Sequence, residues 1–174
     1  MKKLQVSELA SAGLRAGDMI LLSGELFTAR DAAHRRLSEL LAAGEPLPFP
    51  LDGAVIYYCG PAKAPPGRVI GSCGPTTSRR MDCYAPALYA LGVAATIGKG
   101  ARGAEVADSC LRGGSLYLCA VGGAGALAAA RVTACRVEAF AELGCEAVLR
   151  LTVKDFPLIT AIDGKGGNIF EPHP

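Results

Sequence analysis

Short apolar runs bounded by glycine or proline alternate with helix-forming stretches along this chain, and this alternation restricts the fold more than any other feature. Apolar runs of this length predict buried strands. The expected strands are 18–23, 54–58, 68–71, 93–97, 116–121, 147–153 and 158–162. The expected helices are 86–91, 105–111, 124–130 and one that runs from a capping box at Thr28 to a terminating Gly44. Because strands and helices are interspersed, the sequence predicts an α/β fold with a mixed sheet and flanking helices.

Size and charge limit the classes of function that fit this chain. With 174 residues it is long enough for one hydrophobic core, so residues 1–174 are expected to form a single domain. A net charge of +2 and the absence of tryptophan argue against binding to nucleic acid or to an acidic membrane surface. Residues 1–8 lack the apolar run of a signal peptide, and glycines interrupt the longest uncharged stretch, 113–130. We therefore expect a cytoplasmic protein without a membrane span.

The seven cysteines predict neither a metal site nor a disulfide framework. Their number is odd, no two lie closer than nine positions, and no C-x-x-C pair occurs. Each is expected to be a buried free thiol that packs as a small apolar side chain, as is usual in a reducing compartment.

Three short segments place polar side chains where the backbone is expected to turn tightly. They are Arg30–His34 at a helix start, Gly74–Asp82, and Gly98–Gly100 at a strand end. Two arginines and one lysine that converge on the hydroxyl groups of the second segment would bind a small dianion such as a dicarboxylate. Backbone amides near Thr76 and Thr77 would add hydrogen-bond donors. A histidine at the first segment is a candidate proton-transfer group at neutral pH.

Each of these residues also has an ordinary structural role. Thr76 and Thr77 could simply cap a helix, and Lys99 between glycines could be an ordinary turn residue. His34 could be a partly buried histidine of a helix. The turn at 123–128 also fits the G-x-G-x-x-A pattern of dinucleotide-binding sites, although small residues equally allow close packing of a helix on a strand. The dianion site therefore depends on the three segments meeting in the fold.

Several segments resemble the β subunit, or C-terminal domain, of iron–sulfur-dependent hydro-lyases, namely class I fumarase and L-tartrate dehydratase. They follow one another over nearly the whole chain: TARDAAHRRL (28–37), DGAVIYYCGP (52–61), GPTTSRRMDCYAP (74–86), IGKG (97–100), CAVGGAGALAA (119–129) and VKDFPLITAIDGKGGN (153–168). The pattern GPTTS-x-RMD followed by IGKG is far more specific than a lone glycine motif. The glycine turn at 123–128 falls inside the resembling segments.

The resemblance implies a swivelling β/β/α fold and a reaction that adds water to an unsaturated dicarboxylate or removes it from the hydroxy acid. The substrate-binding residues that it implies are Arg30, Arg80, Lys99 and Thr77. Thr76 matches the threonine proposed as catalytic base in this family, and neighbouring cations would be needed to stabilise its alkoxide. His34 matches a histidine that is a candidate acid/base or orienting group.

The resemblance also implies a cofactor and a partner. Members of the family use a 4Fe–4S cluster held by the α subunit or N-terminal domain, so no metal ligand is expected in this chain. We expect a β subunit that hydrates fumarate to malate only in a hetero-oligomer with its α subunit. The isolated β subunit is expected to form a homodimer. L-Tartrate and methylated dicarboxylates stay open as substrates, as do a non-catalytic binding module and a nucleotide-binding subunit. Arg79 stands where many fumarase-type members have glycine, and the register favours Arg80 as the arginine that faces the pocket.

Overall fold

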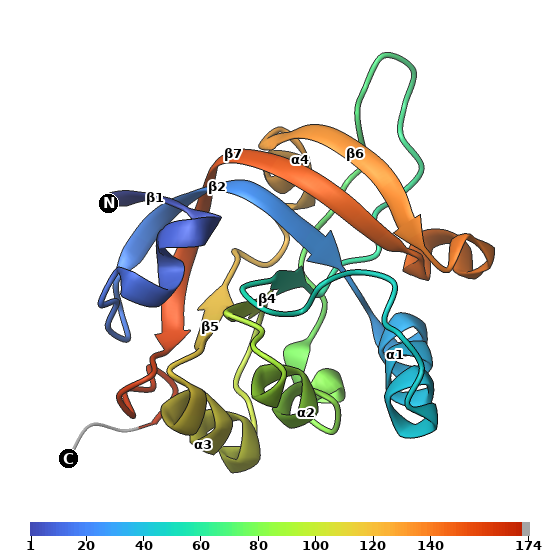
Figure 1. Ribbon diagram of the computed structural model, residues 1–174. Coiled ribbons are helices and arrows are strands. Elements are labelled where there is room, and N and C mark those ends of the chain that lie inside the picture. The colour runs from blue at the N-terminus through green and yellow to red at the C-terminus, as the bar shows by residue number, and fades with distance from the viewer. Residues whose placement is uncertain (172–174) are drawn as a thin grey trace.

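A computed structural model describes residues 1–171 of the protein (Figure 1). The strands are β1 (Lys2–Gln5), β2 (Met19–Thr28), β3 (Val55–Tyr57), β4 (Ala95–Gly98), β5 (Leu116–Cys119), β6 (Val132–Ala139) and β7 (Val148–Ile162). The α-helices are α1 (Asp31–Ala43), α2 (Ala85–Ala90), α3 (Ala104–Gly113) and α4 (Gly125–Ala129). The short 3₁₀ helices are η1 (Val6–Ser11), η2 (Ser78–Met81) and η3 (Ala141–Glu146). None of the helices within the described range has both the length and the apolar character that a membrane crossing requires.

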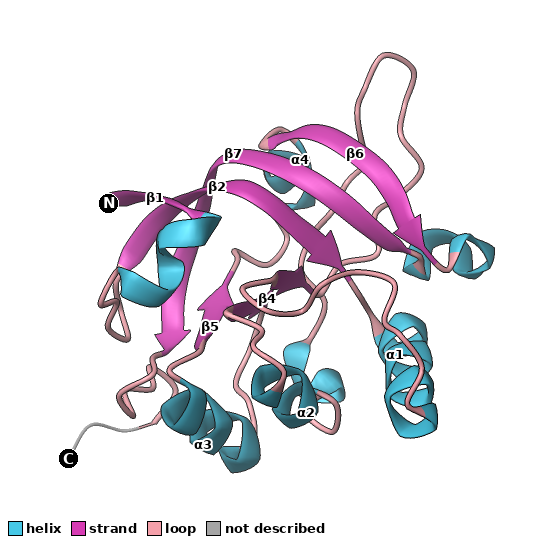
Figure 2. Cartoon of the chain, viewed as in Figure 1, coloured by secondary structure: helices cyan, strands magenta, loops and turns pink. Residues whose placement is uncertain are grey.

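The strands of the described residues form one mixed sheet, part of which closes on itself (Figure 2). Strands β1 to β5 run parallel, each paired with the next. Strand β7 runs antiparallel to both β5 and β2, so β2, β3, β4, β5 and β7 form a closed, barrel-like ring. Strand β6 pairs with β7 outside this ring. The predicted α/β class with a mixed sheet and flanking helices is confirmed, whereas the sequence does not predict the closure.

One bent strand replaces two of the expected ones. Residues 147–153 and 158–162 lie almost entirely in β7, a strand of 15 residues whose partners change along its length. Its first half pairs with β6 and its second half with β5, while β2 runs beside both halves. Asp155 between the halves has a φ of 50°, and the pairing with β2 shifts register there. This bulge lets a single strand complete the ring.

Three other elements differ from the expectation. Residues 68–71 form a loop and not a strand, because the chain leaves the sheet at Gly60 and returns near Ser72, where the Ala62 N–H donates to the Ser72 carbonyl (2.9 Å). Strands β1 and β6 are not predicted from the apolar pattern. Only Leu4 of β1 and only Val132 of β6 are buried, so these strands carry no apolar run.

Helix α1 begins later than the capping box predicts. Its N-cap is Arg30, while Thr28 is the last residue of β2 and its hydroxyl accepts a hydrogen bond from the Leu149 N–H (3.0 Å). The helix ends at Gly44 with a φ of 67°, as predicted. The longer strand carries Arg30 directly to the edge of the sheet.

The core has two parts, one inside the ring and one between the sheet and the helices. Neighbouring residues of a strand point to opposite sides, and Tyr57 and Tyr58 follow this rule. Tyr57 packs in the inner cluster, whereas Tyr58 packs in the outer cluster with residues of α1 and α2. Strands β3 and β4 are buried on both sides, which explains their continuous apolar runs.

Candidate functional site

The three polar segments meet at one edge of the sheet, where parallel strands end. Strands β2, β3, β4 and β5 run in the same direction, so the residues that follow them lie side by side. The residues that follow these strands include Arg30 after β2, Gly60 after β3, Lys99 after β4 and Gly122 after β5. This region, which we call the carboxyl edge, consists of residues 29–34, 58–60, 73–82, 98–103 and 120–125.

Backbone pairing joins the threonine segment to the lysine turn. The Thr76 N–H donates to the Tyr58 carbonyl (2.7 Å), which follows β3. Thr77 and Lys99 form a parallel β-bridge. The Ser78 N–H donates to the Lys99 carbonyl (3.1 Å), and the Ser78 hydroxyl accepts from the Lys99 N–H (3.0 Å). Thr76, Thr77 and Lys99 therefore lie on adjacent pieces of backbone.

Arg30 reaches the same edge from β2. Its guanidinium lies against Gly60, where an added Cβ would be 2.6 Å from Nη1. Glu146 pairs with Arg30 (Nη2 to Oε1, 3.5 Å) and also accepts the Ala32 N–H at the start of α1 (2.8 Å). The Nε of Arg30 is buried and has no hydrogen-bond partner among the described residues. A buried donor without a partner is uncommon in folded proteins. The Arg30 side chain as a whole is 25% exposed.

Arg79 and Arg80 differ in what they contact. Arg80 donates two hydrogen bonds to Asp31 at the start of α1, from Nε to Oδ1 (3.1 Å) and from Nη2 to Oδ2 (2.8 Å). Burial is the largest single influence on the pKa of Asp31 and acts to raise it. The hydrogen bonds from Arg80 and from the Asp31 backbone, with the charges of Arg80 and Arg30, together hold that pKa below its ordinary value of 3.8. Arg79 is exposed, and no hydrogen bond or ion pair joins its side chain to another residue of the described range. The contacts thus bring Arg80 to the helix start that also carries Arg30, and the role of either residue stays a prediction.

His34 is buried beneath the edge. Its Nδ1 lies 2.8 Å from the Arg30 carbonyl, which can only accept, so Nδ1 carries the proton. Nε2 is then a buried acceptor that has no partner within residues 1–171. Burial between Tyr58 and Tyr84, whose ring centroids lie 5.3 and 5.5 Å away, lowers the pKa of His34 to about 4. The imidazole is therefore neutral at neutral pH, and this geometry fits an orienting group for the Arg30 backbone better than a proton donor.

Lys99 differs from the two arginines because no acidic side chain of the described part of the chain pairs with it. Its stem runs past the turn after β5, where an added Cβ at Gly122 would lie 3.5 Å from Cδ. The residue is half-buried.

The charges of the edge suit a small anion. Arg30, Arg80 and Lys99 contribute three positive charges, and the paired carboxylates of Asp31 and Glu146 offset two of them. The remaining positive charge, the bidentate geometry of guanidinium groups and the nearby threonine hydroxyls together can hold a dicarboxylate.

The shortest ion pair at this edge joins Asp82 and Arg102, and no local sequence pattern predicts it. Arg102 Nε lies 2.5 Å from Asp82 Oδ1, and the two side chains are 0% and 7% exposed, respectively. The Gly103 N–H donates to the second oxygen of Asp82 (2.6 Å). Asp82 ends the RRMD run and Arg102 follows the IGKG turn, so the motifs flank the pair. Hydrophobic periodicity predicts helices and strands, but it does not predict which side chains of two loops contact each other.

The cysteines do not form a holder for an iron–sulfur cluster. Nowhere in the described range do three His, Cys, Asp or Glu side chains come together as metal ligands would. The thiols of Cys59 and Cys73 share a hydrogen bond that raises the pKa of Cys59 and lowers that of Cys73. All seven cysteines are free. The expectation that each is buried is wrong for four of them, since Cys119 and Cys135 are half-buried and Cys83 and Cys145 are exposed. The side chains of residues 1–171 therefore do not fit an iron–sulfur cluster.

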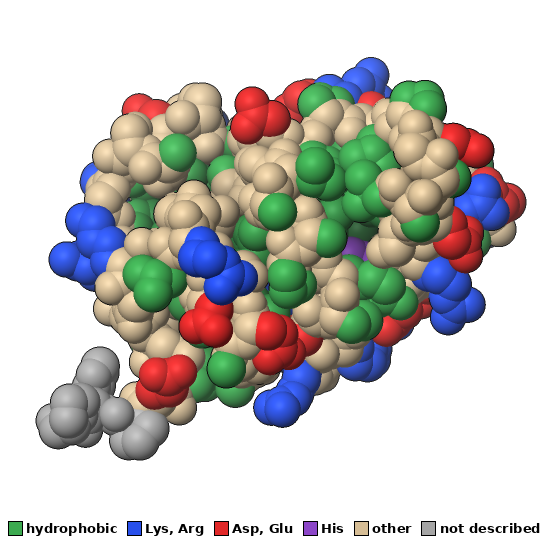
Figure 3. Space-filling view, turned by 60° about the horizontal axis from the view of Figure 1, so that its bottom comes forward, with side chains coloured by type: hydrophobic (Ala, Val, Ile, Leu, Met, Phe, Trp, Pro, Cys, Tyr) green, Lys and Arg blue, Asp and Glu red, His purple; other side chains and the backbone are tan. Residues whose placement is uncertain are grey.

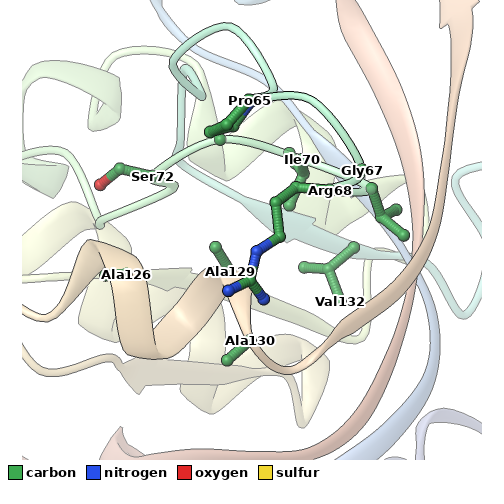
Figure 4. A pocket seen from close by; sticks show the side chains of 11 residues that line it. Pro65, Gly67, Arg68, Ile70, Ser72, Ala126, Ala129, Ala130 and Val132 are labelled. Carbon is green, nitrogen blue, oxygen red and sulfur yellow. The ribbon is translucent and has the colours of Figure 1, made fainter.

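One cavity of the described residues lies beside the carboxyl edge. A cavity of about 400 Å³ lies between the loop at 65–72 and α4, and Arg68 reaches across it toward Ala129 and Ala130 (Figure 4). None of the predicted site residues lines this cavity. On the face drawn in Figure 3, basic and acidic groups are interspersed and do not gather into one charged patch.

Comparison with known proteins decides the family. The family described as "Fumarase C-terminus" matches residues 2–173. The chain belongs to this family. It is 42% identical over 156 residues to fumarate hydratase 2 of Leishmania major, which covers 88% of this chain and 28% of that protein. It is 40% identical over 164 residues to the putative L(+)-tartrate dehydratase subunit beta of Methanocaldococcus jannaschii (91% and 84%) and 36% identical over 177 residues to the L(+)-tartrate dehydratase subunit beta of Escherichia coli (97% and 87%).

This Fumarase C-terminus domain spans only 28% of the fumarate hydratase but most of each tartrate dehydratase β subunit. The resemblance inferred from the motifs is confirmed at the level of the family. The nucleotide-binding alternative loses its structural basis, because α4 leads into β6, which pairs antiparallel with β7 and not parallel with β5. The glycine turn serves packing instead, since an added Cβ at Gly125 would lie 2.9 Å from the Gly74 nitrogen.

Proposed function

We propose that this chain is the β subunit of a two-subunit hydro-lyase that hydrates fumarate to malate reversibly. In this proposal residues 1–174 act as one domain of the swivelling β/β/α type, in the cytoplasm. The observation that carries the proposal is the convergence of the three polar segments at the carboxyl edge. A dicarboxylate needs cations at both ends and a proton-transfer group between them, and this edge offers both.

The residues take the following roles in the proposal. The groups that bind the substrate carboxylates are Arg30, Arg80, Lys99 and Thr77. Thr76 is the catalytic base, since its backbone is bonded beside Tyr58 and the cations nearby stabilise a deprotonated hydroxyl. His34 orients the helix start through its hydrogen bond to the Arg30 carbonyl.

The proposal assigns the cofactor to another polypeptide. An α subunit would hold a 4Fe–4S cluster, which supplies a Lewis acid for the hydroxyl group that is added or removed. The β subunit would bind and orient the dicarboxylate and move a proton. The assembly is a hetero-oligomer, and the isolated β subunit forms a homodimer.

The test is co-expression of this chain with its cognate α subunit under anaerobic conditions. We expect fumarate hydration by the complex and none by the β subunit alone. Thr76→Ala should lower kcat by about 10²-fold or more, while Thr76→Ser should restore part of it. Full activity of Thr76→Ala or Arg80→Ala would remove the site assignment.

L-Tartrate dehydration is the second candidate, because two relatives matched over most of their length are named as tartrate dehydratase β subunits. The same complex should be assayed with fumarate, L-tartrate and a methylated dicarboxylate. The ratio of kcat/KM values identifies the substrate. A complex that forms but converts and binds none of them would favour a non-catalytic module.

A further inference from the structure

A buried ion pair ties together the two segments that carry Arg80 and Lys99. Asp82 lies two residues after Arg80, at the end of η2, and Arg102 lies three residues after Lys99. Arg102 Nε contacts one carboxylate oxygen of Asp82 at 2.5 Å, and the Gly103 N–H donates to the other at 2.6 Å. Both oxygens of the carboxylate therefore bind the segment that follows β4.

The two terminal nitrogens of Arg102 also have hydrogen-bond partners. Nη1 donates to the Thr96 hydroxyl (3.2 Å), and Nη2 lies at the limit of hydrogen bonding to the Tyr58 hydroxyl (3.5 Å). The guanidinium carbon lies 5.3 Å from the ring centroid of Tyr58 and 4.8 Å from that of Tyr117. A buried ion pair holds one geometry only when further hydrogen bonds support it, and here each nitrogen of Arg102 has at least one partner.

A second set of contacts joins the same two segments at their other end. Thr77 and Lys99 form the β-bridge, and Ser78 exchanges two hydrogen bonds with Lys99. The Tyr117 hydroxyl is hydrogen-bonded to Ser78 Oγ (3.0 Å) and to the Gly100 carbonyl (2.8 Å). The segments 76–82 and 98–103 are thus fixed against each other at both ends.

We propose that Asp82 and Arg102 are positioning residues that set the separation of Arg80 and Lys99 at the dianion site. The inference rests on the proposed function. In this proposal neither residue touches the substrate, because both are buried and their charged groups are already paired with each other. Rotation or sliding of η2 would move Arg80 relative to Lys99, and the spacing of two cations must match the fixed spacing of two carboxylates.

The test uses the complex with the α subunit and the variant Arg102→Lys, which keeps the charge but not the planar fork of donors. We expect kcat/KM to fall by about 10-fold or more, mostly through KM. Arg150→Lys is the matched control, because Arg150 also pairs with a carboxylate and lies 5.0 Å from an aromatic centroid, that of Phe27. Its kcat/KM should stay within about 2-fold of wild type.

A double-mutant cycle separates positioning from a general loss of structure. In a Lys99→Ala background the spacing no longer matters, so Arg102→Lys should cost less than about 3-fold there. If the Arg102→Lys chain does not assemble with the α subunit, the same cycle is carried out with Tyr117→Phe. That variant keeps the ring beside Arg102 but removes the hydroxyl, and we expect a fall of about 3-fold or more that also disappears with Lys99→Ala.

The outcomes distinguish the two proposals. A wild-type complex that converts none of the dicarboxylates overturns the proposed function and this inference with it. If the wild-type complex is active and kcat/KM is unchanged in Arg102→Lys (or in Tyr117→Phe, where Arg102→Lys does not assemble), the positioning role alone is overturned. An equal loss in both backgrounds shows a merely structural role and overturns it as well.

Discussion

Two arginine–carboxylate networks in this protein have the same parts and different surroundings. At the carboxyl edge Arg102 pairs with Asp82 beside the ring of Tyr117, and the two ion-pair side chains are 0% and 7% exposed. On β6 and β7, Arg150 pairs with Glu138 beside the ring of Phe27, and these side chains are 22% and 14% exposed. Water screens the second pair more than the first.

The two ion pairs also differ in the other contacts that join the segments on which they lie. Arg150 and Glu138 lie on strands joined by a regular ladder of backbone hydrogen bonds, so the register does not depend on the ion pair. Apart from the ion pair, the segments 76–82 and 98–103 share one β-bridge and a few hydrogen bonds. A site built on loops therefore needs buried side-chain contacts to fix its geometry, whereas a strand pair does not.

Removing one carboxylate from each network should give the largest contrast. Asp82→Ala leaves Arg102 buried without its counter-ion and should lower the free energy of unfolding by about 3–5 kcal/mol. Glu138→Ala should lower it by about 1 kcal/mol or less. Urea unfolding of the full chain at pH 7 measures both values. Equal losses would show that burial does not separate the two networks.

Acidification should weaken the carboxyl edge through His34. Burial lowers its pKa to about 4 from an ordinary 6.5, so the unfolded chain binds a proton between these values and the folded chain does not. The free energy of unfolding should therefore fall as the pH drops below 6.5, by up to about 1.4 kcal/mol per unit. Urea unfolding between pH 7 and 5 tests this against His34→Asn, in which the contribution of the imidazole is absent. A wild type with the same pH slope as the variant would contradict the assignment.

Much of the fold follows from local pattern. Strands β3, β4 and β5 are recognisable because they are buried on both sides, and the end of α1 because Gly44 adopts a left-handed backbone. Strands β1 and β6 are missed because they are largely exposed. The continuity of β7 is missed because the bend at Asp155 depends on pairing with β2, which no local pattern contains.

Local sequence likewise predicts only part of the candidate site. The motifs identify the segments of Thr76, Arg80 and Lys99, since each has a distinctive local sequence. They do not identify the pair of Asp82 and Arg102, because the two residues are 20 positions apart on loops without periodicity. Only the three-dimensional arrangement brings them together.

Two glycines at the carboxyl edge should respond differently to the same added methyl group. A Cβ at Gly98 would overlap the Ser78 hydroxyl, which cannot move freely because it accepts the Lys99 N–H. Gly98→Ala should therefore cost about 2 kcal/mol of stability. At Gly122 the nearest atom, Cδ of Lys99, would lie at an ordinary 3.5 Å, so Gly122→Ala should change stability by less than about 0.5 kcal/mol. Thermal unfolding compares them, and a tolerated Gly98→Ala would argue that the two segments are not tightly coupled.

The smallest effect is expected for the exposed ion pair at the same edge. Arg80 and Asp31 are 48% and 37% exposed, so Asp31→Asn should lower stability by less than about 1 kcal/mol at pH 7. The pKa of Asp31 lies below 3.8 because the hydrogen bonds it accepts and the charges of Arg80 and Arg30 together outweigh the effect of burial. This contribution is therefore present above pH 3.8 and is lost as the pH falls through the lowered value. The difference between wild type and variant should therefore disappear in strong acid. A loss as large as that of Asp82→Ala would erase the distinction between buried and exposed pairs.

The central claim is that Arg80 and Lys99 of the carboxyl edge hold the two ends of a dicarboxylate. Its most direct test is calorimetric titration of the α–β complex with a saturated four-carbon dicarboxylate, which cannot react. Arg80→Ala and Lys99→Ala should each weaken binding by about 10-fold or more, as the loss of a charge-assisted hydrogen bond does, while Arg79→Ala should leave it unchanged. Binding that is lost in Arg79→Ala and kept in Arg80→Ala and Lys99→Ala would contradict the account.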